Sequence, residues 1–143
     1  MTPVDRVAED YVDTIRRACS AATDHDVERA LRHFDDGCVF VDATTGGQGG
    51  KAEAMAFLNE MFTMFPDYSA RVVAAHADGD TVAAAYEITG TLSGPEGSTT
   101  GRRLRWLTTT LNTFDPRSRA CIREIFCMDT SAFEQMLLEA RSA

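Results

Sequence analysis

Residues 68–92 read YSARVVAAHADGDTVAAAYEITGTL, and this stretch decides the fold class of the chain. Two strand-like runs flank the tripeptide DGD, which is a turn signal between paired strands. Residues 102–114 (RRLRWLTTTLNTF) and 120–128 (ACIREIFCM) have the pattern of two further strands. Four consecutive strands of this kind predict an antiparallel sheet in the second half of the chain.

Helical periodicity predominates in the first half. Apolar residues recur at helical spacing in residues 4–18, a second helix is expected over 24–34, and a third over 51–65 is stopped by a proline. A short strand at 38–42 (CVFVD) separates the second and third helices, and a final helix closes the chain. This order predicts an α+β fold in which helices pack on the concave face of a curved antiparallel sheet.

Length and charge narrow the functional classes. With 143 residues, 44% of them hydrophobic, the chain fits a single domain spanning residues 1–143. A net charge of -8 and a pI near 4.8 argue against binding to a nucleic-acid backbone, which needs a basic surface. No apolar run approaches the length of a membrane span, and the N-terminus lacks the layout of a signal peptide. We therefore expect a cytoplasmic protein that binds neither nucleic acid nor membrane.

Cysteine and histidine residues show no spacing typical of a metal site. Cys121 and Cys127 are expected on one face of the same strand, too far apart for a disulfide. All four cysteines are expected to be buried free thiols, and the three histidines are scattered along the chain. We therefore predict that the protein binds no metal.

The predicted architecture offers a pocket, because helices cover only part of a bent sheet. The open end becomes an apolar cavity with few polar groups, which is the usual form of a small-molecule site. Alternation along the strand predicted over residues 102–114 places five residues on the face that we expect to be concave: Leu104, Trp106, Thr108, Thr110 and Asn112. The opposite face carries Leu107, Thr109 and Leu111, and is either a homodimer surface or ordinary solvent-exposed surface.

Five stretches carry a resemblance to a known superfamily, and their order and spacing are its specific part. They are HFDDGCVFVD (33–42), KAEAMAFLNEMFTMFPD (51–67), GDTVAAAYEITGTLSGP (79–95), TTGRRLRWLTTTLNTF (99–114) and IREIFCMDTSAFEQML (122–137). The chain resembles the superfamily named for nuclear transport factor 2 and ketosteroid isomerase, and within it the SnoaL-like polyketide cyclases. The resemblance implies a cone of curved sheet and helices with an internal pocket, often in a dimer.

Two carboxylates match functional positions of these relatives. Asp129 corresponds to the acidic residue that SnoaL-like cyclases use as acid/base, although a one-residue shift would put Thr130 there instead. Asp42 corresponds to the general base of ketosteroid isomerases. The oxyanion donors of those isomerases would fall near Ala18 and Thr110, neither of which matches the required type, so steroid isomerase activity is not expected.

Each carboxylate also has a local alternative. Asp129 precedes a helix and is a good N-cap residue, although Ser131 and Glu134 have the spacing of a capping box two residues further on. Asp42 ends a strand and can form an Asx-turn with the following loop. These local interpretations remain open beside the catalytic ones.

We expect a cofactor-independent cyclase or isomerase that acts on a carbonyl-rich, hydrophobic small molecule. Desolvation raises the pKa of a carboxylate, which makes it a suitable base near neutral pH. The catalytic candidates are Asp129 and Asp42, and the candidate substrate contacts are Trp106, Tyr86, Thr108, Asn112 and Phe62. The alternative is a non-catalytic module of the same fold that binds a hydrophobic metabolite or only dimerises.

Overall fold

The computed structural model describes residues 2–94 and 99–142 and has four helices and six strands. The helices are α1 (Pro3–Thr23), α2 (Val27–Leu31), α3 (Lys51–Met64) and α4 (Thr130–Ser142). The strands are β1 (Phe34–Asp42), β2 (Gln48–Gly49), β3 (Ser69–Asp78), β4 (Thr81–Ser93), β5 (Thr99–Phe114) and β6 (Cys121–Met128). Within the described ranges, no helix combines the length and apolar composition needed to cross a membrane.

All six strands form one sheet in the order β2-β1-β6-β5-β4-β3. The predicted hairpin is confirmed, since β3 and β4 pair antiparallel with Asp78 opposite Thr81. Strands β4, β5 and β6 continue the antiparallel arrangement, whereas β1 pairs with β6 in parallel. The sheet is therefore mixed but mostly antiparallel, and the predicted α+β class is confirmed.

Three local predictions were wrong, one about Phe34 and two about the cysteines. Phe34 was expected within the second helix, but α2 ends at Leu31 and Phe34 begins β1, because its ring packs in the core 4.8 Å from the ring of Phe40. Cys121 and Cys127 do not share a face: Cys121 is buried and Cys127 is exposed, so the expectation that all four cysteines are buried is wrong for Cys127. A register shift in the pairing of β5 with β6, near Phe114, puts an extra residue between these cysteines and reverses the alternation.

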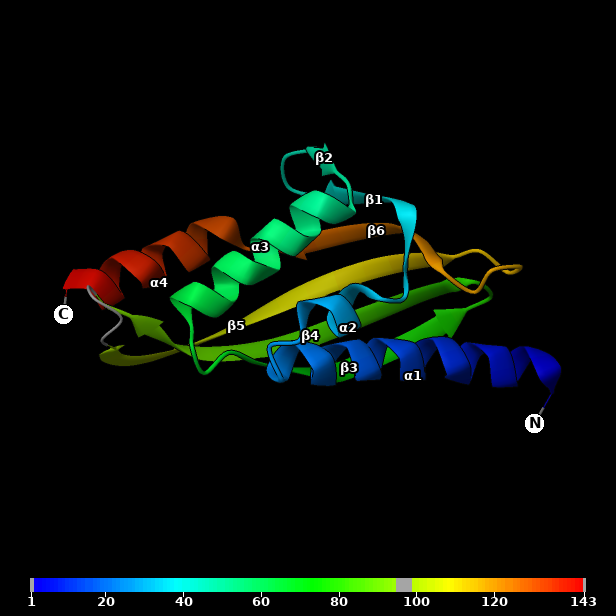
Figure 1. The fold of residues 1–143 in the computed structure, drawn as a ribbon, viewed down its shortest axis with the longest axis horizontal. Helices are drawn as coiled ribbons and strands as arrows, with labels where there is room; N and C mark the ends of the chain where they lie inside the picture. The colour runs from blue at the N-terminus through cyan, green and yellow to red at the C-terminus, as the bar shows by residue number, and fades with distance from the viewer. Residues whose placement is uncertain (1, 95–98, 143) are drawn as a thin grey trace.

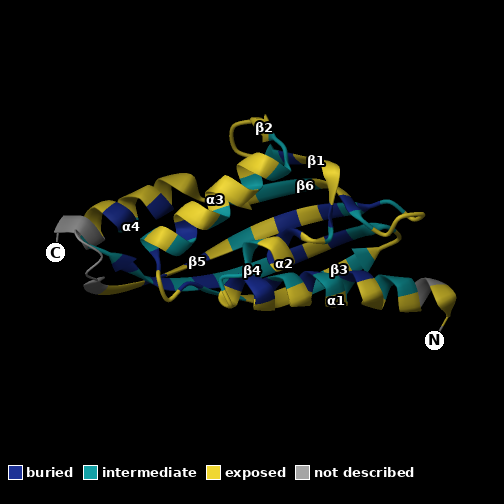
Figure 2. Ribbon diagram, in the orientation of Figure 1, coloured by how far each residue is buried: buried dark blue, intermediate teal, exposed yellow. Residues whose placement is uncertain are grey.

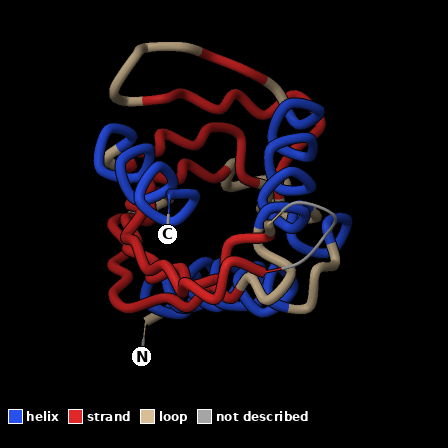
Figure 3. Tube along the Cα trace, turned by 90° about the vertical axis from the view of Figure 1, so that its left-hand side faces the viewer, coloured by secondary structure: helices blue, strands red, loops and turns tan. Residues whose placement is uncertain are grey.

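The helices surround the inner side of the sheet. Figure 1 shows α1 running along β3 and α3 crossing in front of the sheet, and the contacts place α4 against β5. Seen end-on in Figure 3, the strands form a curved wall that the helices close. Figure 2 shows buried and exposed positions alternating along β5. Trp106 and Thr110 are buried, as the sequence predicts.

Two aromatic clusters hold the two ends of the domain together. At one end, Trp106 lies between Phe65 and Phe133, with ring centroids 5.1 and 4.9 Å away. At the other end, the rings of Tyr11 and Phe114 stack with centroids 4.2 Å apart and join α1 to β5. Each cluster belongs to a separate group of buried residues, so the space between them does not have to be filled to keep the fold together.

The outer face of the sheet exposes apolar side chains. Leu107 is 55% exposed and Leu111 is 41% exposed, on the face that the sequence offered as a dimer surface. No partner chain is part of this structure, so the homodimer stays a prediction.

One close approach fixes where α3 ends against the sheet. Gly90 of β4 faces Phe65, the residue after α3, and a Cβ atom at position 90 would lie 2.7 Å from the Cβ of Phe65. Phe65 is fully buried against the Trp106 cluster and cannot move aside without disturbing it. A glycine is therefore required here by packing rather than by backbone conformation.

We expect Gly90→Ala to destabilise the protein by about 1–3 kcal/mol, because the added methyl group overpacks this contact. Urea unfolding followed by circular dichroism would measure the change. Gly37→Ala is the matched control, since a Cβ there meets only the carboxylate end of Asp35 at 3.2 Å. Equal stability of the two variants would contradict the packing argument.

Candidate functional site

A cavity of about 640 Å³ lies between the two aromatic clusters, on the concave side of the sheet. Its lining includes residues of α1, α2 and α3, residues of all six strands, and Thr130 at the start of α4. Phe57 of α3 lines it while remaining 55% exposed, so the cavity opens to solvent beside this helix. The predicted pocket is therefore present, and its size suits a small organic molecule.

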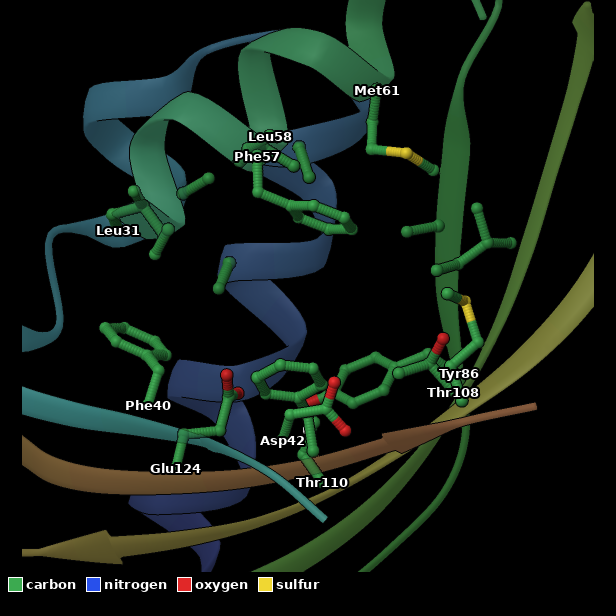
Figure 4. A pocket seen from close by; sticks show the side chains of 18 of the residues that line it. Leu31, Phe40, Asp42, Phe57, Leu58, Met61, Tyr86, Thr108, Thr110 and Glu124 are labelled. Atoms are coloured by element: carbon green, nitrogen blue, oxygen red, sulfur yellow. Dashed lines mark hydrogen bonds between the residues drawn. The ribbon is translucent and has the colours of Figure 1, made fainter. Parts of the chain in front are cut away.

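The walls of the cavity differ in chemistry (Figure 4). The helical side presents apolar side chains, among them Leu31, Phe57, Leu58 and Met61. The strand side presents the polar groups: Asp42, Tyr86, Thr108, Thr110 and Glu124. An apolar molecule bound here would be held against the helices with its polar atoms turned towards the strands.

Glu124 is the most perturbed acid of the site. It lies in β6, and among the described residues no hydrogen bond or ion pair compensates its charge. Burial alone raises the pKa of its carboxyl from the ordinary value of 4.5 to about 7. The part of the side chain that remains accessible faces the cavity, so the acid is desolvated but still reachable by a bound molecule.

A chain of hydrogen bonds lies close by on the strand side. Asn112 Nδ2 donates to Thr110 Oγ1 over 2.8 Å, and Thr110 Oγ1 donates to Tyr86 Oη over 3.0 Å. Burial raises the pKa of Tyr86, so the phenol stays protonated at neutral pH. Tyr86 and Thr110 line the cavity, while Asn112 is completely buried behind them.

Asp42 meets both alternatives that the sequence left open: it forms a turn and it borders the cavity. Its Oδ1 accepts hydrogen bonds from the backbone N–H groups of Thr44 and Thr45, 2.8 and 3.4 Å away, which is the geometry of an Asx-turn. Asp42 also lines the cavity at the end of β1. One face of this carboxylate is thus occupied by the turn while the residue borders the site.

Asp129 lies outside the cavity. It is exposed at the start of α4, where its Oδ1 accepts the N–H of Ala132 over 2.9 Å and its carbonyl accepts that of Phe133 over 3.0 Å. These are the contacts of a helix N-cap, so the capping alternative describes its geometry. The structure does not place Asp129 in the desolvated setting that its expected chemistry requires.

The other expected contacts divide into two groups. Trp106, Tyr86 and Thr108 line the cavity. Asn112 reaches it only through Thr110, and Phe62 is not among the lining residues: its ring stacks on His25 at 4.3 Å. The helix α3 instead turns Phe57 towards the cavity, because its apolar residues are too many for one stripe.

His33 is a further buried polar group that the sequence did not single out. It lines the cavity between Phe34 and Phe114, and burial followed by the charge of Lys51 lowers its pKa to about 4. Its Nε2 has no hydrogen-bond partner within the structure. The imidazole is therefore neutral at pH 7 and is not an acid catalyst.

Metal binding has no support among residues 2–94 and 99–142, where no group of three or more His, Cys, Asp or Glu side chains is arranged to hold an ion.

Sequence reasoning missed Glu124, although a signal was present. Phe126 and Met128 are apolar, so a strand that turns them inwards also turns Glu124 inwards. If the alternation of faces is counted from the buried Cys121 instead, Glu124 is expected on the outer face. Only the register shift near Phe114 shows which of the two counts is right.

Comparison with solved structures agrees with this architecture. A "Putative SnoaL-like polyketide cyclase" from Jannaschia sp. CCS1 matches with a TM-score of 0.73 and 22% identity, over 94% of this chain and 93% of that chain. PrhC from Penicillium brasilianum matches with a TM-score of 0.77 and 11% identity, over 94% and 89%. A hypothetical protein with a ketosteroid isomerase-like fold from Catenulispora acidiphila, in complex with trimethylamine, matches with a TM-score of 0.65 and 14% identity, over 83% of this chain and 85% of that chain.

At these identities the structural likeness establishes the fold, which is that of nuclear transport factor 2 and ketosteroid isomerase. No curated protein matches the chain. The SnoaL-like domain model matches residues 15–118, well over half of the sequence, and the chain therefore belongs to the SnoaL-like domain family.

Proposed function

We propose that this protein is a cofactor-independent cyclase or isomerase that moves protons on a carbonyl-rich hydrophobic molecule, with Glu124 as its acid/base. The supporting observation is the position of Glu124: a carboxyl with a pKa of about 7, raised by burial, in reach of an apolar cavity. A polyketide-like substrate is consistent with the family and with the printed name of the Jannaschia relative.

The proposed reaction uses only proton transfers and one carbon–carbon bond. Glu124, ionised, removes a proton from a carbon next to a carbonyl, and the electron pair of that C–H bond forms an enolate. The enolate carbon then attacks a second carbonyl of the same folded molecule, which becomes an alkoxide. Protonated Glu124 gives its proton to the alkoxide and ends the cycle as the carboxylate with which it began. No oxidant or reductant is consumed.

The environment of Glu124 suits both halves of this cycle. A base with a pKa near 7 is half ionised at neutral pH and still strong enough to accept a proton from carbon when the developing charge is stabilised. Asp42, on the same side of the cavity, is available to polarise or orient the substrate, with its Oδ1 held by the backbone of the turn. Asp129 has no part in the proposed reaction.

The charge of the cavity indicates what kind of molecule it accepts. The lining includes three carboxylates, Asp42, Glu53 and Glu124, whereas no lysine or arginine is among the described lining residues. An anionic substrate would be repelled when these acids are ionised. We therefore infer a neutral substrate. A binding protein without catalysis remains the alternative, and it predicts that Glu124 has no role in proton exchange.

The first test is proton exchange on 2-tetralone, a neutral bicyclic ketone of the size class that a cavity of about 640 Å³ admits. We expect the wild-type protein to accelerate deuterium uptake from D₂O at the carbon next to the carbonyl, with a rate that rises with pH around 7. Glu124→Gln should lower the acceleration by about 100-fold, because general-base catalysis is lost. Mass spectrometry would follow the label.

Glu60→Gln is the matched control, because Glu60 is exposed on α3 outside the cavity lining. Asp129→Asn separates the two acids: it should retain exchange if Glu124 is the base. Exchange that is equal in wild type and Glu124→Gln, or no faster than buffer alone, would count against the proposed enzyme.

The second test is independent of any substrate. The folded state holds the Glu124 proton more tightly than the unfolded state, so stability falls as the pH rises from about 4.5 to about 7. The shift corresponds to about 3 kcal/mol. Urea unfolding at pH 5 and pH 8 should show a smaller loss of stability in Glu124→Gln than in wild type. The same pH dependence in both proteins would show that Glu124 is not desolvated.

A further inference from the structure

We propose that the hydroxyl of Tyr86 is the hydrogen-bond donor to the negatively charged oxygen of an enolate bound in this cavity, and that Thr110 and Asn112 are positioning residues that direct its proton. The inference rests on the proposed function, because the enolate is the intermediate that proton removal by Glu124 would create. It assigns the donor that the reaction needs once a proton has left carbon.

The hydrogen-bond chain runs in one direction, from Asn112 through Thr110 to Tyr86. The amide nitrogen of Asn112 can only donate, so its contact with Thr110 Oγ1 at 2.8 Å makes the hydroxyl of Thr110 an acceptor there. In the structure the hydroxyl of Thr110 donates its one proton to Tyr86 Oη over 3.0 Å. Tyr86 Oη therefore accepts a hydrogen bond, and its own proton has to point away from Thr110.

The space that remains for that proton is the cavity. Tyr86 is a lining residue, and among the described residues no group accepts its proton. Figure 4 shows Tyr86 and Thr110 on the same side of the pocket as Glu124. A ketone has its oxygen close to the carbon that loses the proton, so a base and a donor on one wall can act on the same molecule.

The burial of the positioning residues supports a functional role. Asn112 is 0% exposed and Thr110 is 9% exposed, and buried polar groups cost free energy unless their hydrogen bonds are satisfied. Apolar side chains of similar size would fill these positions without that requirement. The chain of hydrogen bonds fixes the orientation of the Tyr86 hydroxyl. An oriented donor does not have to reorganise when negative charge develops next to it.

The other candidate donors of this wall are less suitable. The indole ring of Trp106 is packed between Phe65 and Phe133 as part of the core. Thr108 lines the cavity, but among the described residues no hydrogen bond orients its hydroxyl. Tyr86 is the candidate whose proton direction is set by its neighbours.

The test measures binding of a stable enolate, 2-acetylcyclohexane-1,3-dione, by isothermal titration calorimetry at pH 6, where Glu124 with its pKa of about 7 is mostly protonated. Tyr86→Phe should weaken binding by about tenfold to 100-fold, because a hydrogen bond to a charged oxygen is lost. The affinity for acetylcyclohexane, a neutral ketone of similar shape, should change by less than about threefold.

The positioning role has its own variants. Thr110→Val keeps the shape of the side chain but removes the hydroxyl that links Asn112 to Tyr86. It should weaken enolate binding, as Tyr86→Phe does, whereas Thr110→Ser should bind the enolate as the wild type does. Thr109→Val makes the same change on the exposed face of β5 and should have no effect. Thermal unfolding of each variant would check that the fold is retained.

The outcomes separate this inference from the proposed function. Equal losses for enolate and neutral ketone in Tyr86→Phe, or no enolate binding by the wild type, would overturn the assignment of Tyr86, even if Glu124→Gln abolishes proton exchange. Conversely, Tyr86→Phe could weaken enolate binding selectively while the rate of proton exchange does not depend on Glu124. That result would support Tyr86 as the donor and refute Glu124 as the base.

Discussion

A carboxyl group without a counter-charge, enclosed by apolar side chains, is the constraint on which the site depends. Taking an ionised carboxylate out of water is costly unless a positive or hydrogen-bonding partner replaces the lost hydration. At Glu124 the described neighbours supply neither, and the carboxyl responds by holding its proton up to a pH of about 7. The fold thus keeps a destabilising group at its centre, as is typical of residues retained for chemistry rather than for stability.

The fold tolerates both this acid and the cavity around it because its packing is concentrated elsewhere. Trp106, Phe65 and Phe133 join α3, α4 and the sheet at one end, and Tyr11 and Phe114 join α1 to the sheet at the other. A cavity between two packed clusters keeps its shape without being filled, which a reaction with fixed geometry requires. Polar groups on the strands and apolar groups on the helices then orient a bound molecule in one way.

Much of the fold could be predicted from the sequence, since hairpin and strand signals are local. The DGD turn gave the pairing of β3 with β4, and alternation along β5 identified the face of Trp106 and Thr110 as the inner one. Phe34 was misplaced because its choice between helix and strand depends on a partner ring at Phe40 that no local pattern reveals. Glu124 was missed for a similar reason: the register shift near Phe114 decides which face it occupies, and this shift arises from pairing between strands.

Asp129 and Glu124 illustrate how neighbouring acids on one stretch of chain acquire different roles. A carboxylate at the start of a helix, as Asp129 is, accepts hydrogen bonds from backbone N–H groups of the first turn. A base that takes a proton from carbon needs the opposite environment, in which the anion is poorly stabilised until the proton arrives. The sequence presents both acids within the same strand-to-helix segment, and the family resemblance pointed to Asp129. Solvation distinguishes them: the cap faces water and backbone donors, while Glu124 faces the cavity. The proposed catalytic assignment therefore rests on which acid the last strand buries, not on which acid follows that strand.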